Sequence, residues 1–398
     1  VYAGLINKNI VSELQSLGSN GIGISGADGN SILAVKRTGT EHDYGFVGDI
    51  TQINQPLISD LLRINLVPVF CALTHDGCNQ ILNTNADSIA AELGRGRDID
   101  GVVAVGGGSS MDVAKVVAVL LGGEQQLSEL YGVGMVTGTR LPLILVPTTA
   151  GTGSEVTPVA VITTGETTKA GVSSPVLLPD VAVLDAGLTL GLPPAVTAMT
   201  GVDAMVHAIE AYTSRHQKNP ISDHLARQAL ELLSRNIRTA VHDGQNREAR
   251  ENMLLGACLA GQAFANAPVA AVHALAYPLG GHYHIPHGLS NSLVLPSVLE
   301  FNAPEASELY AELVELVTGE PVQGSSEAKT EVLIAALRQL IDDVALPATL
   351  QQAGVDESHM EILAEDAMLQ QRLLVNNPRD VNYDDALAIY RAAYRGAA

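Results

Sequence analysis

The 398-residue sequence has few aromatic and few basic residues. It contains no tryptophan, only 4% aromatic residues, and 22 lysines and arginines against 43 aspartates and glutamates, which gives a net charge of −21. Proteins that bind single-stranded nucleic acid need aromatic side chains for stacking, and proteins that bind duplexes need a patch of cations. The composition therefore excludes nucleic acid as an expected partner and favours small polar substrates or cofactors.

Cysteines and long apolar runs are also scarce. The three cysteines form no CxxC pair, and their odd number is typical of a reducing compartment. The most apolar stretch, residues 101–123, is interrupted by Asp112 and Lys115, whereas a membrane span needs about 20 apolar residues. The first residues lack a charged and then apolar secretion signal. We expect a cytoplasmic protein without membrane contact.

The remaining composition and the pattern along the chain predict a folded protein of two or three domains. Hydrophobic residues make up 46% and charged residues 16%, which is typical of globular proteins. Up to about residue 190, short β-branched runs alternate with amphipathic stretches, the pattern of βαβ units with a mostly parallel sheet. After Pro193 and Pro194 the periodicity becomes helical. We predict an α/β cofactor-binding domain over 1–192 and an all-helical domain over 193–398.

The predicted elements are short strands in the first half and long helices in the second. We expect strands at 21–25, 67–73, 101–105, 143–146 and 181–184. We expect helices at 195–213, 221–243 and 247–264, with several more to the end.

A glycine-rich turn is the strongest signal in the first half. The sequence 106–109, Gly-Gly-Gly-Ser, lies between a predicted buried strand and a predicted helix, where backbone N–H groups bind a pyrophosphate. A polar loop at 147–155 also follows a strand, and its hydroxyls complete such a cradle. The GxGxxG match at 21–26 differs, because Ile22 and Ile24 place its glycines inside a strand; we do not interpret it as a nucleotide site.

The second half contains a set of metal-ligand residue types. Asp203 and His207 are four residues apart, on one face of a predicted helix, and four of the eleven histidines lie between 273 and 287. One carboxylate and three imidazoles suit zinc, or ferrous iron if a position stays open for substrate. His284 is a candidate substrate contact or proton shuttle. Residues 288–292 lack the closing glycine and preceding strand of a nucleophile elbow, so we do not expect serine catalysis.

From about residue 98 to the end, the chain resembles the iron-containing (group III) alcohol dehydrogenase family. The motifs that carry this resemblance are 106–109 with Asp112 and Lys115, 147–155, 192–194, 201–204 with His207, and His273 with 286–288. The resemblance implies a dehydroquinate synthase-like architecture, with a Rossmann-like α/β domain followed by an all-α metal-binding domain.

The resemblance also implies site residues. The implied metal ligands are Asp203, His207, His273 and His287. The implied cofactor-binding residues are Gly106, Gly107, Gly108, Ser109, Asp112, Thr148, Thr149, Thr152 and Lys169. Tyr277 takes the place of a histidine that some members carry near the nicotinamide, and we assign Tyr277 and His284 to the catalytic groups.

The first 90 or so residues resemble a different family, the N-acetylglutamate kinases of the amino-acid kinase family. The motifs are 2–8, 25–30, 43–49, 74–77 and 83–87. In that family the positions that match Asn83 and Asp87 bind the acyl amino acid and organise phosphoryl transfer. The segment lacks the kinase's glycine-rich loop and lysine, so we do not expect kinase activity. We interpret the chain as kinase-like over 1–94 and dehydrogenase-like over 98–192, joined near 93–97.

These observations lead to one main hypothesis and several alternatives. The main hypothesis is an alcohol dehydrogenase that uses Fe²⁺ or Zn²⁺ as a Lewis acid and exchanges a hydride between a small alcohol or hydroxy acid and NAD or NADP. The alternatives are a catalytically impaired fusion that binds only metal, an enzyme like glycerol dehydrogenase or maleylacetate reductase, and a residual acetylglutamate kinase. The expected partners are an alcohol or aldehyde substrate and further copies of the chain, in a dimer or larger homo-oligomer.

Overall fold

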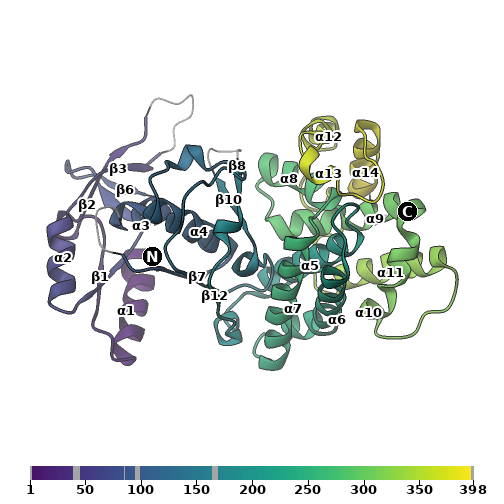
Figure 1. The fold of residues 1–398 in the computed structure, drawn as a ribbon, viewed down its shortest axis with the longest axis horizontal. Coiled ribbons are helices and arrows are strands. Elements are labelled where there is room, and N and C mark those ends of the chain that lie inside the picture. The colour runs from purple at the N-terminus through teal and green to yellow at the C-terminus, as the bar shows by residue number, and fades with distance from the viewer. Residues whose placement is uncertain (1, 39–44, 85, 95–98, 164–168, 396–398) are drawn as a thin grey trace. The chain divides into compact units, whose positions relative to one another are not determined.

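The computed structural model describes residues 2–38, 45–84, 86–94, 99–163 and 169–395. By its internal contacts the chain divides into two compact units, residues 1–100 with 120–124, and residues 101–119 with 125–398. Figure 1 shows the strands in the N-terminal part of the chain and the helices in the C-terminal part. The division at residue 100 lies close to the change of motifs in the sequence.

The first unit contains two small sheets and three α-helices. The helices are α1 (Asn7–Ser16), α2 (Gln55–Arg63) and α3 (Ala86–Gly94). The strands are β1 (Gly21–Ile24), β2 (Ile32–Lys36), β3 (Gly48–Ile53), β4 (Val67–Phe70), β5 (Leu73–His75) and β6 (Ile81–Asn83). β1 and β4 pair in parallel, and the other four form a sheet in the order β3-β2-β5-β6. Gly21 and Gly23 of the 21–26 match lie in β1, as expected, whereas Gly26 follows the end of the strand.

The kinase-like motifs are only partly described. Asn83 ends β6. Residues 43, 44 and 85, the side chain of Asp87, and residues 95–97 of the expected joint lie outside the described residues.

The α/β part of the second unit is built around a three-stranded parallel sheet. Its elements are β7 (Val102–Gly106), α4 (Gly108–Gly122), β8 (Gly132–Val133), β9 (Leu143–Pro147), β10 (Val159–Thr163), β11 (Lys169–Ser173) and β12 (Val181–Ala182). The parallel sheet has the order β12-β9-β7, and a second sheet has the order β10-β11-β8. Among the described strands β7 pairs only with β9. The five predicted strands are present; the short strands β2, β3, β5, β6, β8, β10 and β11 were not predicted.

The rest of the second unit is helical, as predicted. The helices are α5 (Pro194–Thr213), α6 (Pro220–His242), α7 (Arg247–Asn266), α8 (Ala271–Tyr283), α9 (His287–Ala311), α10 (Val314–Thr318), α11 (Ser326–Asp343), α12 (Met360–Met368), α13 (Gln371–Leu374) and α14 (Tyr383–Arg395). Pro194 opens α5, where proline's missing N–H costs nothing. Asn219 caps α6 by accepting hydrogen bonds from the backbone N–H groups of Ile221 and Ser222.

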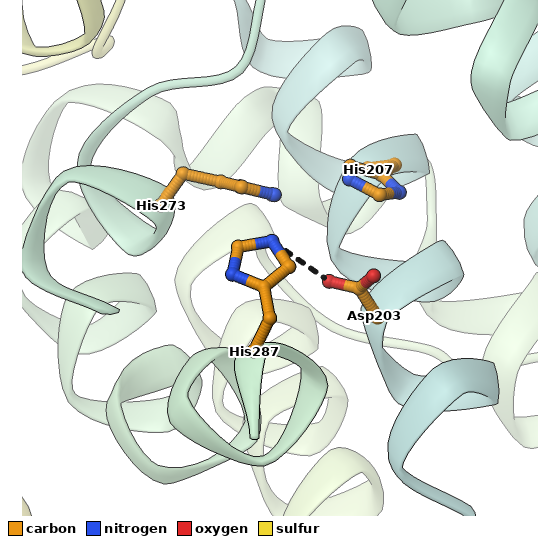
Figure 2. A group of neighbouring side chains, drawn as sticks. All are labelled: Asp203, His207, His273 and His287. Carbon is orange, nitrogen blue, oxygen red and sulfur yellow. Dashed lines mark ion pairs between the residues drawn. The ribbon is translucent and has the colours of Figure 1, made fainter. Parts of the chain in front are cut away.

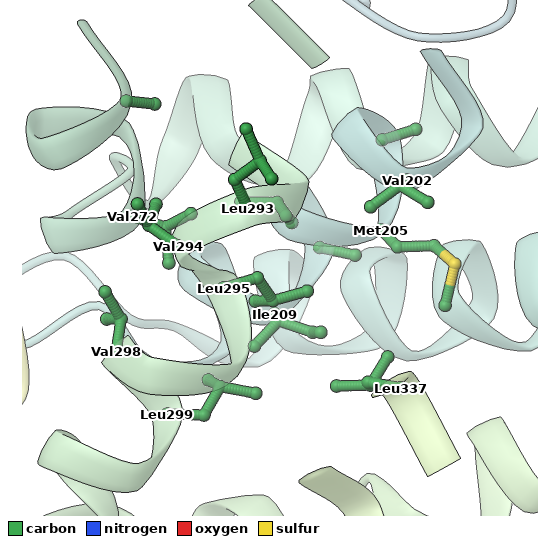
Figure 3. Packing of buried hydrophobic residues seen from close by; sticks show 14 of the residues in the cluster. Val202, Met205, Ile209, Val272, Leu293, Val294, Leu295, Val298, Leu299 and Leu337 are labelled. Carbon is green, nitrogen blue, oxygen red and sulfur yellow. The ribbon is translucent and has the colours of Figure 1, made fainter. Parts of the chain in front are cut away.

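Helix α5 lies at the centre of the helical core and is buried from Gly201 to Thr213. Figure 3 shows Met205 and Ile209 of α5 packed among leucines of α9 and Leu337 of α11. This burial explains why the polar side chains of α5 need partners within the protein. Among the described residues, no single helix is long and apolar enough to cross a membrane, and the bent pair α7 and α8 passes that test by length and composition only.

Candidate metal centre and cofactor loops

Three helices bring a carboxylate and three imidazoles together. Asp203 and His207 lie one turn apart on α5, His273 lies in the first turn of α8, and His287 is the first residue of α9. One ligand atom from each lies within 4.8 Å of the others. Figure 2 shows the four side chains pointing toward one another. The structure therefore assembles the four residues that the sequence predicts as metal ligands.

A glycine allows the start of α9 to approach α5 this closely. A Cβ atom at Gly288 would lie 2.2 Å from the Met199 carbonyl oxygen and 3.2 Å from the Asp203 Cβ. Because Gly288 has none, the neighbouring His287 places its Nε2 atom 3.6 Å from the Asp203 Oδ1 atom. Helix packing therefore requires the glycine of the Pro-His-Gly motif.

The protonation states around the cluster suit a cation. Burial lowers the pKa of His207 to about 3, although Asp203 opposes this shift, so the imidazole stays neutral and keeps a lone pair. Burial opposes ionisation of Asp203, but the three histidines and the Asn291 amide together hold its pKa below the usual value. Within the described part of the chain, His207 Nδ1 is buried without a hydrogen-bond partner. A buried carboxylate beside a neutral imidazole and two further histidines is a donor set that a divalent cation completes.

Glu210, which belongs to none of the sequence motifs, fixes one of the imidazoles. Its Oε2 atom accepts a hydrogen bond of 2.6 Å from His273 Nδ1, and its Oε1 atom accepts one of 2.7 Å from the Val272 backbone N–H. This arrangement leaves His273 Nε2 free to bind a metal. A signal existed in the sequence, since Asp203, His207 and Glu210 follow the i, i+4, i+7 spacing of one helix face.

Replacing Glu210 by glutamine is expected to weaken metal binding about 10- to 100-fold, because His273 loses the carboxylate that orients its ring and raises its basicity. Competition for Fe²⁺ or Zn²⁺ against a chelator measures this change. Glu231→Gln is the matched control, since Glu231 is paired with Arg235 outside the cluster. Equal metal affinities for Glu210→Gln and the control would contradict the role of Glu210.

Asn291 is the second residue of the site that the sequence did not predict. It lies one turn after His287, and its Nδ2 atom donates a 2.6 Å hydrogen bond to Asp203 Oδ1. The same atom lies 3.3 Å from His273 Nε2 and 3.4 Å from His287 Nε2. Asn291 is fully buried, so its amide stays fixed among the ligand atoms. Its two N–H groups can orient Asp203 and one of the two imidazole nitrogens at a time.

Two aromatic rings flank the cluster. The Phe264 ring stacks on His207 with centroids 4.5 Å apart, and the Tyr277 ring centroid lies 5.9 Å from that of His287. Burial raises the pKa of Tyr277, with Arg372 opposing the shift, so the hydroxyl keeps its proton. His284 differs: it is exposed at the end of α8, in the left-handed region with φ of 54°.

The glycine turn predicted for the cofactor lies between β7 and α4. A Cβ atom at Gly106 would lie 2.6 Å from the Ser110 Cβ, and one at Gly108 would lie 2.7 Å from Thr152. These two glycines are therefore required by contacts within the protein. A Cβ atom at Gly107 would be in ordinary contact, 3.5 Å from Thr149, so the fold itself leaves room for a side chain at Gly107.

The remaining residues predicted for the cofactor surround this turn. The backbone N–H of Thr148 donates to the Gly106 carbonyl at 2.9 Å, which connects the loop after β9 to the glycine turn. Ser109 is exposed in the first turn of α4. Lys169 begins β11, and its side chain lies outside the described residues. The structure thus places Ser109, Thr148, Thr149 and Thr152 around the N-terminus of α4.

Asp112, also predicted for the cofactor, uses both carboxylate oxygens within the protein. One accepts a 2.5 Å hydrogen bond from Ser154 Oγ, and the other accepts a 3.0 Å bond from the Val161 backbone N–H. The buried Lys115 lies 3.8 Å from Asp112 and donates to Thr157 Oγ1 and the Val159 carbonyl. These bonds connect α4 to the 147–155 loop and to β10.

The 147–155 loop also packs directly on the helices of the metal cluster. A Cβ atom at Gly151 would lie 2.7 Å from the Thr200 Cβ on α5. Gly153 is in the left-handed region with φ of 60°, and its Cβ would lie 2.5 Å from the Gly261 Cα on α7. One loop therefore contacts the glycine turn, the ligand-bearing helix α5 and the neighbouring helix α7, all within the second unit.

Comparison with known proteins agrees with these observations. The family description "Fe-containing alcohol dehydrogenase family, C-terminal" matches residues 197–394, "Iron-containing alcohol dehydrogenase" matches 76–186, and "Amino acid kinase family" matches 1–107. The kinase match is consistent with the interpretation of a chain joined from two families, and it overlaps the dehydrogenase match between residues 76 and 107.

Individual relatives cover most of the chain. Long-chain-alcohol dehydrogenase 1 of Geobacillus thermodenitrificans is 40% identical over 93% of this chain and 94% of its own length. The crystal structure of 1,3-propanediol oxidoreductase aligns with a TM-score of 0.75 and 33% identity over 97% of this chain and 95% of that one. Sulfoacetaldehyde reductase from Bifidobacterium kashiwanohense in complex with NAD+ aligns with a TM-score of 0.70 and 26% identity, over 97% and 94% of the two chains. This chain belongs to the iron-containing alcohol dehydrogenase family.

Proposed function

We propose that this protein transfers a hydride reversibly between a small alcohol or hydroxy acid and NAD or NADP, at a ferrous ion bound by Asp203, His207, His273 and His287. The observation that carries this proposal is that the four ligand atoms lie within 4.8 Å of one another. When bound, the ion supplies Lewis acidity, which lowers the pKa of the alcohol and polarises the aldehyde. The iron-containing alcohol dehydrogenases among the relatives support iron over zinc.

The residues around the cluster have separate roles in this proposal. Asp203 supplies the negative charge, and the three histidines, of which His207 is held neutral by burial, supply nitrogen ligands. Glu210 and Asn291 orient the ligands through their hydrogen bonds. Tyr277 lies against His287 and contributes a protonated hydroxyl beside the substrate. His284 is placed at the exposed end of α8, where we propose that it exchanges protons with solvent.

The cofactor is proposed to bind at the N-terminus of α4. The backbone at Gly107 and the Ser109 side chain face its pyrophosphate, and Thr149 and Thr152 close the other side. Lys169 completes the predicted set. We assign Asp112 a positioning role, because its carboxylate oxygens are both used by Ser154 and Val161.

Asp112→Asn is expected to raise the dissociation constant for NAD about tenfold while iron binding stays unchanged. An amide offers one oxygen in place of two acceptors, so either Ser154 or Val161 loses its bond and the 147–155 loop shifts. Equilibrium titration with NAD and metal analysis of the same samples separate the two effects. Asp380→Asn, at an exposed pair with Arg215, is the control. A parallel loss of iron would contradict a role confined to the cofactor loops.

Turnover tests the proposed function as a whole. Iron-loaded protein is expected to reduce NAD or NADP in the presence of 1,3-propanediol or 1-butanol, measured by nicotinamide absorbance. No turnover with either cofactor across a panel of alcohols, in protein that binds iron, would contradict it. In that case, titration with NAD identifies the impaired fusion, because such a protein would bind iron but no nicotinamide. ATP turnover with N-acetylglutamate would reveal a residual kinase.

The domain organisation, assembly and location are proposed on separate grounds. The start of α5 at Pro194 supports a boundary between a 1–192 and a 193–398 domain. Val103 and Val105, exposed on β7, favour association of copies into a dimer or larger homo-oligomer, which light scattering tests. Three free cysteines, Cys78 among them exposed, support a reducing compartment such as the cytoplasm.

A further inference from the structure

One arginine near the candidate metal ligands has no acidic partner among the residues that the structure describes. Each arginine that the structure describes, other than Arg372 and Arg250, has a carboxylate oxygen within 4.0 Å. Arg250 is 2% exposed and donates to Thr197 Oγ1 and the Gly244 carbonyl. Arg372 is exposed. In a chain with 43 acidic and 22 basic residues, a cation without a carboxylate is unusual.

The position of Arg372 connects it to the candidate active site. Its guanidinium carbon lies 6.0 Å from the centroid of the Tyr277 ring, and that ring lies 5.9 Å from the His287 ring. The short helix α13 that carries Arg372 is anchored by the buried Leu373 and Leu374. The guanidinium is therefore held beside the aromatic ring that flanks the metal ligands.

The two acidic groups that act on the Tyr277 hydroxyl, Asp203 and Glu210, are already partnered. Asp203 accepts a hydrogen bond from Asn291, and Glu210 accepts bonds from His273 and from the Val272 backbone. Arg372 also interacts with the Tyr277 hydroxyl. A guanidinium has five N–H donors, so this interaction uses only some of those of Arg372. A guanidinium binds a planar oxyanion through two parallel hydrogen bonds, and such charge-assisted bonds are about twice as strong as neutral ones.

We propose that Arg372 binds an oxyanion, a carboxylate or a sulfonate, at the end of the substrate remote from the carbinol carbon. The inference rests on the proposed function and names the substrate class of that site: ω-hydroxy acids and the matching aldehyde acids. Because Arg372 lies beside the Tyr277 ring and not among the four ligand side chains, the substrate places several bonds between its anion and its reacting carbon. In a chain of net charge −21, this arginine also offsets the general repulsion of an anionic substrate.

Matched substrates that differ in charge test this proposal. With iron-loaded protein and NAD, kcat/KM is measured for 4-hydroxybutanoate, for its neutral amide and for 3-hydroxypropane-1-sulfonate. The ratio of acid to amide is expected to fall at least about tenfold in Arg372→Gln, through KM and not kcat, and to recover in part in Arg372→Lys. The relative effect on the carboxylate and the sulfonate shows which oxyanion the site prefers.

Controls separate this inference from the proposed function. Arg338→Gln removes an arginine paired with Glu300 and is expected to leave the ratio unchanged. An unchanged ratio in Arg372→Gln, with normal oxidation of 1-butanol, overturns the role of Arg372 alone. Absence of turnover with every alcohol overturns the proposed function, and this substrate class with it. Glutarate, a dead-end diacid, is expected to inhibit 1-butanol oxidation at least about tenfold less strongly in Arg372→Gln.

Discussion

Protein in which His273 is replaced by alanine is expected to lose its bound iron and to lose alcohol oxidation about a thousandfold or more. Removal of a Lewis acid forfeits several kcal/mol of transition-state stabilisation, and about 1.4 kcal/mol corresponds to a factor of ten. His273 is buried, and Glu210 orients it toward Asp203 and His287. Metal analysis of the purified variant and its kcat/KM with 1,3-propanediol measure the two losses.

A second variant and a control keep this result interpretable. Alanine at 273 removes the imidazole partner of the buried Glu210, which destabilises the fold as well as the metal site. His287→Ala avoids this problem, because the His287 side chain is 37% exposed and Glu210 keeps its bond to His273. His282→Ala is the control, since His282 is paired with Asp366 instead. Iron retained at wild-type stoichiometry in both ligand variants would overturn the ligand assignment.

Replacing Gly107 by alanine is expected to raise the dissociation constant for NAD about a hundredfold with little change in thermal stability. The new methyl group meets no protein atom closer than 3.5 Å, so the fold accommodates it. It projects into the space proposed for the pyrophosphate and forces the cofactor away from the backbone, and a hundredfold loss of affinity corresponds to about 2.8 kcal/mol. Titration with NAD and the melting temperature of the same sample measure the two quantities.

Two other glycines provide the comparison for this prediction. Gly171 has no atom within 4 Å of its added Cβ, so Gly171→Ala is expected to change neither quantity much. Gly108→Ala meets Thr152 at 2.7 Å and is expected to lower the melting temperature as well as the affinity. If Gly107→Ala binds NAD as tightly as the wild type, the cofactor does not approach the backbone at this position.

The sequence predicts the parts of the site that depend on residue type and local spacing. The histidines and Asp203 are metal-ligand types, and a glycine run between a strand and a helix is typical of phosphate binding. Glu210 and Asn291 escaped prediction because buried carboxylates and amides serve many structural purposes. Their roles depend on which side chains of α8 and α9 meet α5, and local spacing does not contain that information.

Asp112 and Arg372 also show that a residue's role depends on contacts that the local sequence does not reveal. Asp112 lies in the glycine motif, so its position suggested the cofactor, yet both its oxygens are used by the loop and by β10. Arg372 lies far from every motif in the sequence, and only the packing of α13 against α8 places it near Tyr277.

Periodicity predicts the long helices well because burial on one face repeats every turn. The short strands β10 and β11 lack such a repeat.

The close approach of Gly153 and Gly261 has a consequence for how this enzyme tolerates sequence change. Each glycine excludes any side chain at the other, because an added Cβ would meet the opposing Cα within 2.8 Å. Replacing Gly261 of α7 by a larger residue would push the 147–155 loop outward and displace Thr149 and Thr152. The measured effect of this mutation in the helical half would then be weaker nicotinamide binding. Directed evolution of the helical half is therefore expected to be restricted at position 261, although α7 carries none of the proposed metal ligands.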